Sequence, residues 1–243
     1  MADTSDHSSH PAGEANLETG PGGTKPSGSA QAFAGSAPVT GATLPKVPIH
    51  IQGMQGPMLT DTVYISFSAE ITPGTCESLL AVLSNLVNQN VPRIYLLLST
   101  PGGSVMNGMN LYNVMRGLPC ELVIHNVGNV DSIGNAIYLA GAKRYCCPHA
   151  TFMFHGVGFD VQQGVRLEEK FLRERIDAVV SDQRRIGTVL EERTSLQREQ
   201  IDGLFLEAQT KDSAFAVSCG IVHEVRNVDI PPGGPVISLV FQR

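Results

Sequence analysis

The sequence predicts an α/β fold of repeated βαβ units, from which one long helix projects. Short apolar runs alternate with amphipathic helical patterns between residues 61 and 142. Glycine-rich turns follow several of these runs, and a further amphipathic pattern extends over residues 166–193. Alternation of this kind implies parallel strands that are covered by helices. Functional sites in such sheets form where strand carboxyl ends meet helix amino ends.

The elements of the first half follow from their patterns. Residues 61–68 and 93–100 are apolar runs bounded by turn formers, and the second is typical of a strand buried on both faces. Residues 73–90 have a helical apolar face, with Thr75 near the expected N-cap. The next expected elements are a helix within 101–118, a strand at 120–128 and a helix that begins at Ser132.

The second half predicts fewer strands and longer helices. Two short strands separated by Pro148 are expected within residues 143–157. If residues 166–193 form one helix, it is roughly 40 Å long and projects to meet another subunit. A break near Gly187 would instead give two shorter helices. The rest of the chain predicts two helices, the second ending at Gly220, then a short strand and an apolar run that adds an edge strand or docks elsewhere.

Composition separates a tail from a folded part. Residues 1–45 are rich in Gly, Ser, Ala, Pro and Thr and are expected to be disordered, whereas residues 46–243 are expected to form one domain. The tail lacks the features of a secretory signal, and no run has the roughly 20 apolar residues that a membrane span needs. The formal net charge is −6 without a basic cluster, which excludes nucleic acid and membrane as partners. A cytoplasmic protein is therefore expected.

The five cysteines suggest structural thiols. An odd number of cysteines without secretory features predicts that they are reduced. Cys146 and Cys147 are followed by His149 and His155, a set that raises the question of a metal site. The spacing fits no zinc pattern, and adjacent cysteines do not readily direct both sulfurs at one ion. We therefore expect buried thiols, no metal and no cofactor.

Ser132 lies between an apolar run and a segment crowded with Gly and Ala. A serine hydroxyl acts as a nucleophile when a base removes its proton and donors bind the oxyanion that forms. His155 ends an apolar strand and is a candidate base. Gly102 and Gly103 follow a buried strand, where backbone N–H groups are free to bind an oxyanion. The competing interpretation is an N-cap serine, a surface histidine and an ordinary turn.

Four stretches together resemble one family. They are "STPGGSVMNGMNLYNVM", "DSIGNAIYLAGAKR", "PHATFMFHG" and "AVSCGIVHEV". They resemble the proteolytic subunit of the Clp (caseinolytic) protease, ClpP, a serine peptidase family with a crotonase-like fold, over roughly residues 60–227. The resemblance implies that Ser132 is the nucleophile, that His155 is the general base, and that the N–H groups of Gly103 and Ile133 form the oxyanion hole. It also implies that two segments flank a peptide held as an added β-strand, through Ser104, Val105, Gly156, Val157 and Gly158.

The sequence departs from the family in four places, one of which is a loop after "AGAK" that is two residues shorter. The aspartate of the triad falls on Ala208, and the neighbouring Glu207 is the tentative third acid, with Asp202 and Asp212 more distant. Asp131 precedes the nucleophile where the family has a small residue, and its carboxylate would repel an oxyanion if it faced the site. The region after His155 is about four residues longer, in the part that joins two rings in the family.

The leading hypothesis is a Clp-like serine endopeptidase, a hydrolase that cleaves unfolded chains or short peptides inside a homo-oligomeric ring. The chain contains no "GxxxxGK[ST]" motif, so a separate AAA+ ATPase would have to unfold substrates. The alternative is a non-catalytic ring subunit or scaffold, because Ala208 leaves Ser132 without a competent triad. A lesser alternative is an acyl-CoA enzyme of the crotonase type, since that fold shares an oxyanion hole of two N–H groups.

Overall fold

The computed structural model describes residues 61–164 and 166–241. The tail expected at residues 1–45 lies outside this range. The strands are β1 (Thr62–Ser68), β2 (Arg93–Thr100), β3 (Glu121–Asp131), β4 (Lys143–Cys146), β5 (Thr151–Met153), β6 (Thr210–Lys211), β7 (Glu224–Val225) and β8 (Val236–Leu239). The helices are α1 (Pro73–Asn88), α2 (Val105–Arg116), α3 (Gly134–Tyr138), α4 (Glu169–Arg193), α5 (Arg198–Glu207) and α6 (Ser213–Ser218). Among the described residues, no helix is both long and apolar enough to cross a membrane.

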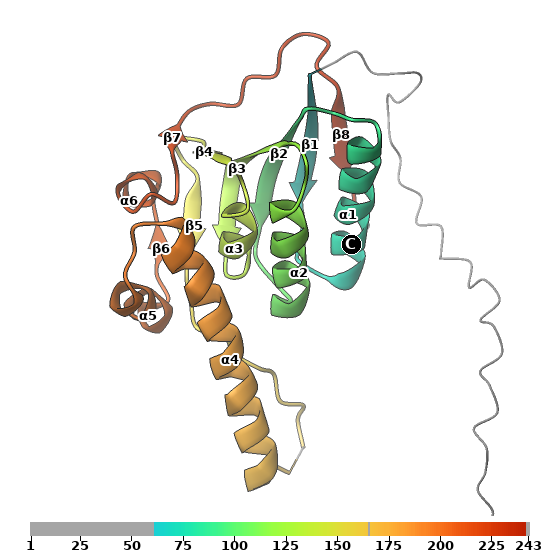
Figure 1. The fold of residues 1–243 in the computed structure, drawn as a ribbon. Coiled ribbons are helices and arrows are strands. Elements are labelled where there is room, and N and C mark those ends of the chain that lie inside the picture. The colour runs from blue at the N-terminus through green and yellow to red at the C-terminus, as the bar shows by residue number, and fades with distance from the viewer. Residues whose placement is uncertain (1–60, 165, 242–243) are drawn as a thin grey trace, which may run out of the picture. The chain divides into compact units, whose positions relative to one another are not determined.

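One sheet organises these elements. Its order is β6-β5-β3-β2-β1-β8, and β4 pairs with β3 and β7 beside this path. The pairs are parallel except for β5 with β6, as the βαβ pattern predicts. The final apolar run forms β8, which adds to the edge of the sheet at β1. Figure 1 shows α1, α2 and α3 on one face of the sheet, with α4 extending away from it.

The main core lies between the sheet and these helices. Ile65, Leu96 and Ile124 from three strands are fully buried against apolar residues of the helices, such as Leu79 and Leu83 of α1. Each buried aliphatic side chain of this kind contributes about 1.5–3 kcal/mol of transfer free energy. The β2 prediction is confirmed, because side chains on both of its faces are buried.

Two helix predictions are resolved by the geometry. The N-cap of α1 is Thr72, and Thr75 is the third helical residue, whose side chain completes a capping box. The expectation that Thr75 lies near the N-cap is therefore confirmed, and the cap itself is Thr72. α4 is one unbroken helix through Gly187. A Cβ at Gly187 would meet the end of the Arg198 side chain of α5, so this glycine leaves room for that guanidinium and does not break the helix.

A buried arginine joins the end of α4 to the sheet. Arg144 is only 4% exposed, and burial lowers its pKa to about 10. Its guanidinium donates to the carbonyl oxygens of Ile221 at 2.7 Å, Gly220 at 2.9 Å, Arg193 at 3.2 Å and Gly141 at 3.3 Å. One side chain thus binds carbonyl groups from the turn before β4, the end of α4 and the turn after α6.

We expect Arg144→Met to lower the free energy of unfolding by about 3 kcal/mol or more, because several buried carbonyl groups lose their donor. Urea denaturation measures this difference. Arg93→Gln is the control, since Arg93 is exposed and pairs with Glu121 at the surface, where such pairs contribute about 0–1 kcal/mol. Equal effects of the two substitutions would contradict the assignment.

A second, smaller cluster covers the other face of the sheet. It contains Tyr64, Tyr95, Leu97 and Val123. The fully buried His125 lies beside it, with Nδ1 2.8 Å from the Tyr95 hydroxyl and Nε2 3.0 Å from the Arg226 carbonyl oxygen. The Arg226 carbonyl oxygen only accepts hydrogen bonds, so Nε2 carries a proton. Burial disfavours the charged ring, so Nδ1 of the neutral imidazole accepts from the Tyr95 hydroxyl, whose pKa burial raises to about 12.

This arrangement predicts a loss of stability at acidic pH. Burial lowers the pKa of His125, so the unfolded chain binds a proton that the folded chain resists. The free energy of unfolding should hold above the unfolded-state pKa of about 6.5 and fall as the pH drops below it. Denaturation between neutral and mildly acidic pH tests this. His125→Gln should flatten the slope, and an unchanged slope would contradict the prediction.

Candidate active site

Ser132 follows β3 directly in a strained backbone conformation. Its φ angle is 56°, in the left-handed region that residues with a Cβ rarely adopt. Its N–H donates to the Met153 carbonyl oxygen at 2.9 Å, which joins this turn to the end of β5. The N-cap of α3 is Ile133, without a side-chain cap, and α3 begins at Gly134. The prediction of a helix that begins at Ser132 was wrong, because a left-handed residue ends β3 before the helix starts.

Asn135 supports this turn and was not identified from the sequence. It is 2% exposed, and its amide nitrogen donates to the carbonyl oxygens of Ser132 at 3.1 Å and Met153 at 2.8 Å. Among the described residues, its amide oxygen is buried without a hydrogen-bond partner. A lone amide side chain in the small and apolar run "GNAIYLAGA" was the available signal. It holds the backbone of Ser132 against β5.

The loop that contains Gly102 and Gly103, here called the glycine loop, lies against Ser132. Gly102 has φ 91°, and a Cβ placed on it would lie 2.6 Å from the Ser132 Cβ. The Ile71 N–H donates to the Gly102 carbonyl oxygen at 2.8 Å, and the Ser104 N–H donates to the Ile71 carbonyl oxygen at 2.8 Å. The loop is therefore fixed on both sides of Gly103, whose φ is 141°.

The two amides expected to form the oxyanion hole belong to this region. Gly103 lies in the glycine loop, and Ile133 is the residue after Ser132. No described residue accepts a hydrogen bond from the N–H of either one. Two uncommitted backbone donors close to a serine hydroxyl fit the chemistry of oxyanion binding.

His155 lies two residues beyond β5, the strand whose Met153 carbonyl oxygen accepts from the Ser132 N–H. β3 and β5 pair with Asp131 opposite Met153, so the segments that carry the serine and the histidine run side by side. The ring of His155 is partly exposed, and its Nδ1 lies 2.8 Å from the Gly156 carbonyl oxygen. No hydrogen bond joins the Ser132 hydroxyl to this ring among the described residues, and such bonds are often long without substrate.

The acid expected near His155 is not bonded to it. Glu207 ends α5, is about half exposed, and its carboxylate lies 3.9 Å from Lys211 Nζ. Ala208 ends the helix with φ 50°. Asp212 accepts from the Phe215 N–H as the N-cap of α6. No described carboxylate has a hydrogen bond to the His155 ring, so the assignment of Glu207 as third acid stays a prediction.

The segment that contains Ala208 nevertheless runs beside His155. The Phe154 N–H donates to the Gln209 carbonyl oxygen at 3.2 Å, and the Gly156 N–H donates to the Phe205 carbonyl oxygen at 3.0 Å. These bonds lie on either side of His155 in the chain and on either side of Ala208. The position that the family resemblance gives to the triad aspartate is therefore adjacent to the candidate base.

Asp131 is held by a neighbouring amide. The Asn129 amide nitrogen donates to the Asp131 carboxylate at 2.6 Å and to the Thr100 carbonyl oxygen at 3.1 Å. The Ser99 hydroxyl donates to the Asn129 amide oxygen at 2.9 Å. This network supplies the Asp131 carboxylate with a donor and ties it to β2 through Asn129. Asn129 is a second polar residue that the sequence reasoning did not single out.

The expected peptide-binding segments have different structures. Ser104 is the N-cap of α2, and Val105 is the first residue of that helix. The Ser104 N–H is occupied by the Ile71 carbonyl oxygen, so it is not available to a peptide strand. Residues 156–158 belong to no strand and are partly or fully exposed. A peptide-binding role for these segments stays a prediction.

A comparison with models of protein families shows which family the chain belongs to. The model of the Clp protease family matches residues 54–229 of the chain. The chain belongs to the Clp protease family. This confirms the resemblance based on the glycine loop, the serine and histidine segments and the "AVSCGIVHEV" stretch.

Individual members of the Clp protease family are moderately similar. The ATP-dependent Clp protease proteolytic subunit 1 of Mycobacterium tuberculosis (strain ATCC 25618 / H37Rv) is 32% identical over 112 residues, which cover 42% of this chain and 56% of that relative. The chain thus spans just over half the length of this relative. The proteolytic subunit 2 of Corynebacterium diphtheriae is 28% identical over 177 residues, covering 67% of this chain and 81% of the relative.

A solved structure supports the fold. A mutant of ClpP1 from Listeria monocytogenes matches with a TM-score of 0.60 and 22% identity, over 69% of this chain and 92% of that chain. The fold is therefore the crotonase-like ClpP fold, as expected. Among the described residues, no group of three or more His, Cys, Asp or Glu side chains is placed to hold a metal ion.

Proposed function

We propose that this member of the Clp protease family is a serine endopeptidase that hydrolyses peptide bonds of unfolded chains or short peptides inside an oligomeric ring. One observation carries the proposal. Ser132 adopts a left-handed turn at the end of β3, pressed against the glycine loop and close to two uncommitted amides. A strained serine at such a junction is typical of a nucleophile held out of regular structure.

The proposed reaction uses these groups in sequence. The Ser132 oxygen attacks the peptide carbonyl carbon while His155 accepts the hydroxyl proton. The N–H groups of Gly103 and Ile133 bind the oxygen that becomes negative. His155 then gives its proton to the departing amine as the C–N bond breaks, which leaves an acyl ester on Ser132. Water, activated by His155, hydrolyses this ester.

Glu207 enters the proposal as a nearby charge. Its carboxylate is paired with Lys211 across 3.9 Å, so it would have to leave this weak pair to reach His155. Glu207→Gln tests whether Glu207 acts as the third acid. A large loss of peptidase activity would support this assignment, and a small loss would refute it.

The assembly is part of the proposal. Only the second half of α4 is buried, whereas Ile176 and Val180 in the first half are 54% and 48% exposed. An apolar stripe of this kind on a projecting helix fits contact with another subunit. We propose a homo-oligomeric ring in the cytoplasm, served by a separate AAA+ ATPase that unfolds substrates, because the chain has no ATP-binding motif.

Labelling by a fluorophosphonate tests the nucleophile. Intact mass should show one adduct on the assembled chain, and both Ser132→Ala and His155→Ala should abolish it. Ser218→Ala is the control, because this hydroxyl donates to the Phe215 carbonyl oxygen within α6. An adduct that persists in Ser132→Ala would refute the assignment.

The non-catalytic ring subunit is the second candidate, and Ala208 favours it. Absence of any adduct in a folded and assembled protein, together with incorporation into rings of an active homologue, would support this candidate.

A further inference from the structure

We propose that the backbone carbonyl of Gly156 orients His155 in place of the missing triad carboxylate. This inference rests on the proposed function and assigns Gly156 as a positioning residue. The observation behind it is the distance of 2.8 Å between His155 Nδ1 and the Gly156 carbonyl oxygen.

The hydrogen bond fixes the tautomer of the ring. A carbonyl oxygen only accepts hydrogen bonds, so Nδ1 must carry the proton. In a neutral imidazole the other nitrogen then has a free lone pair. Nε2 is the atom that can receive the proton of a serine hydroxyl, as in a triad where a carboxylate holds Nδ1–H. The carbonyl therefore performs one of the two tasks of the aspartate.

The residue that carries this carbonyl is bonded to α5 through its N–H. The Gly156 N–H donates to the Phe205 carbonyl oxygen at 3.0 Å, and the Phe154 N–H donates to the Gln209 carbonyl oxygen at 3.2 Å. Phe154 and Phe205 are 2% and 7% exposed, so one residue of each bond is buried in the core. The backbone before and after His155 is thus attached to the end of α5 and the turn that follows.

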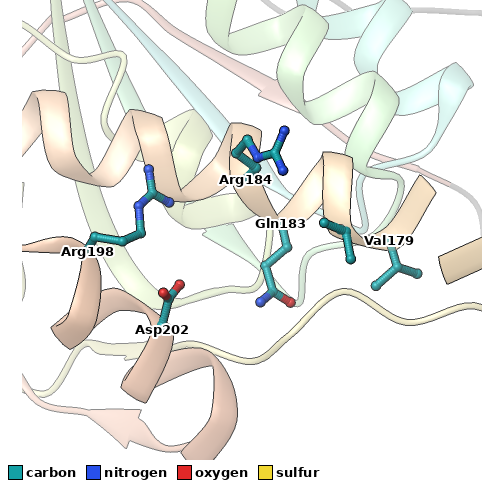
Figure 2. Close-up of a pocket in the computed structure, with 6 residues that line it drawn as sticks. Val179, Gln183, Arg184, Arg198 and Asp202 are labelled. Carbon is teal, nitrogen blue, oxygen red and sulfur yellow. The ribbon is translucent and has the colours of Figure 1, made fainter. Parts of the chain in front are cut away.

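Helix α4 closes the other side of Gly156. A Cβ at this glycine would lie 3.1 Å from the Gln183 amide oxygen, closer than most Cβ contacts. Figure 2 shows Gln183 extending from α4 on the side away from Arg184, in the groove between α4 and α5. Val179 and Asp202 line the same groove, whose volume is about 380 Å³. Gly156 thus lies between the two helices, and a side chain there would displace Gln183.

The carbonyl leaves the second task of the carboxylate undone. A neutral group orients the ring, but it carries no full charge to stabilise the imidazolium that forms during acylation. The arrangement therefore predicts a site in which the His155 ring is correctly oriented but acylation is slow.

The tautomer is measured directly on the full chain. Long-range proton–nitrogen correlation spectra of protein labelled with nitrogen-15 histidine, recorded at alkaline pH, report which nitrogen is protonated, and His155→Ala assigns the signal. Protonated Nδ1 with unprotonated Nε2 is expected. Protonated Nε2 would overturn the proposal. The result does not depend on activity, so loss of fluorophosphonate labelling would reject the proposed function while the tautomer still decides this inference.

A pair of substitutions tests the attachment to α5. Gly156→Pro removes the N–H that bonds to Phe205, and we expect the rate of fluorophosphonate labelling to fall at least about 10-fold. Gly156→Ala keeps the N–H and the carbonyl and needs only a shift of the flexible Gln183 side chain, so its loss should be clearly smaller. Equal losses would assign the effect to bulk against Gln183 and overturn the positioning role. Where Gly156→Pro does not fold, the tautomer of the unmodified chain decides.

Discussion

Ala208→Asp should raise kcat/KM for a short peptide substrate by about 100-fold. Removing the triad aspartate of a serine protease costs about 10⁴-fold, through loss of both orientation and charge stabilisation. Here the Gly156 carbonyl already contacts His155 Nδ1, so the new carboxylate should restore mainly the charge. Ala208 has φ 50°, a conformation that Asp tolerates better than most residues with a Cβ. The helix end should therefore accept the substitution.

Ala208→Asn is the matched control. Asparagine has nearly the same shape and also tolerates the left-handed region, but it carries no charge. It should give little gain, and adding Ser132→Ala to Ala208→Asp should abolish the activity. Hydrolysis of a fluorogenic peptide by the assembled protein measures all four chains. If Asp gave no more activity than Asn, the missing charge would not limit the site, and the non-catalytic ring subunit would be favoured.

The sequence was sufficient for elements whose pattern is long or whose burial is extreme. The continuous apolar run of β2 and the stripe along α4 predicted their structures correctly, because periodicity and burial determine both. Short elements were harder to predict from the sequence. α3 has only five residues, and its start depends on the left-handed turn at Ser132, which no periodic pattern reveals. The sequence indicated the region of the α1 cap but not the capping residue, because Thr72 and Thr75 are both good capping residues.

The candidate site shows the same division. The glycine loop, Ser132 and His155 could be proposed because their order and spacing along the chain are visible in the sequence. The supports of the site depend on contacts between distant segments. The bond from Gly156 to Phe205 and the amide of Asn135 between Ser132 and Met153 exist only after α5 and β5 have packed. Backbone groups make several of these contacts, and they leave no trace in residue identity.

Gly102→Ala should lower the rate of fluorophosphonate labelling by about 10²- to 10³-fold. The glycine has φ 91°, and the added methyl group would lie 2.6 Å from the Ser132 Cβ and 2.9 Å from the Asp131 carbonyl oxygen. Neither atom belongs to a flexible side-chain end, so the loop or the serine must move. A displacement of about 1 Å is enough for a 10²-fold loss, and loss of one oxyanion donor costs about 10²- to 10³-fold.

A second glycine distinguishes local strain from general damage. Gly74→Ala lies within α1, and its methyl group meets nothing within 4 Å. It should leave the labelling rate unchanged and should not lower the melting temperature, since alanine favours helix more than glycine does. Gly102→Ala should keep the far-ultraviolet circular dichroism of the fold while it loses labelling. Labelling at the original rate would mean that the reactivity of Ser132 is independent of this loop, and Gly103 would then have no place in the oxyanion hole.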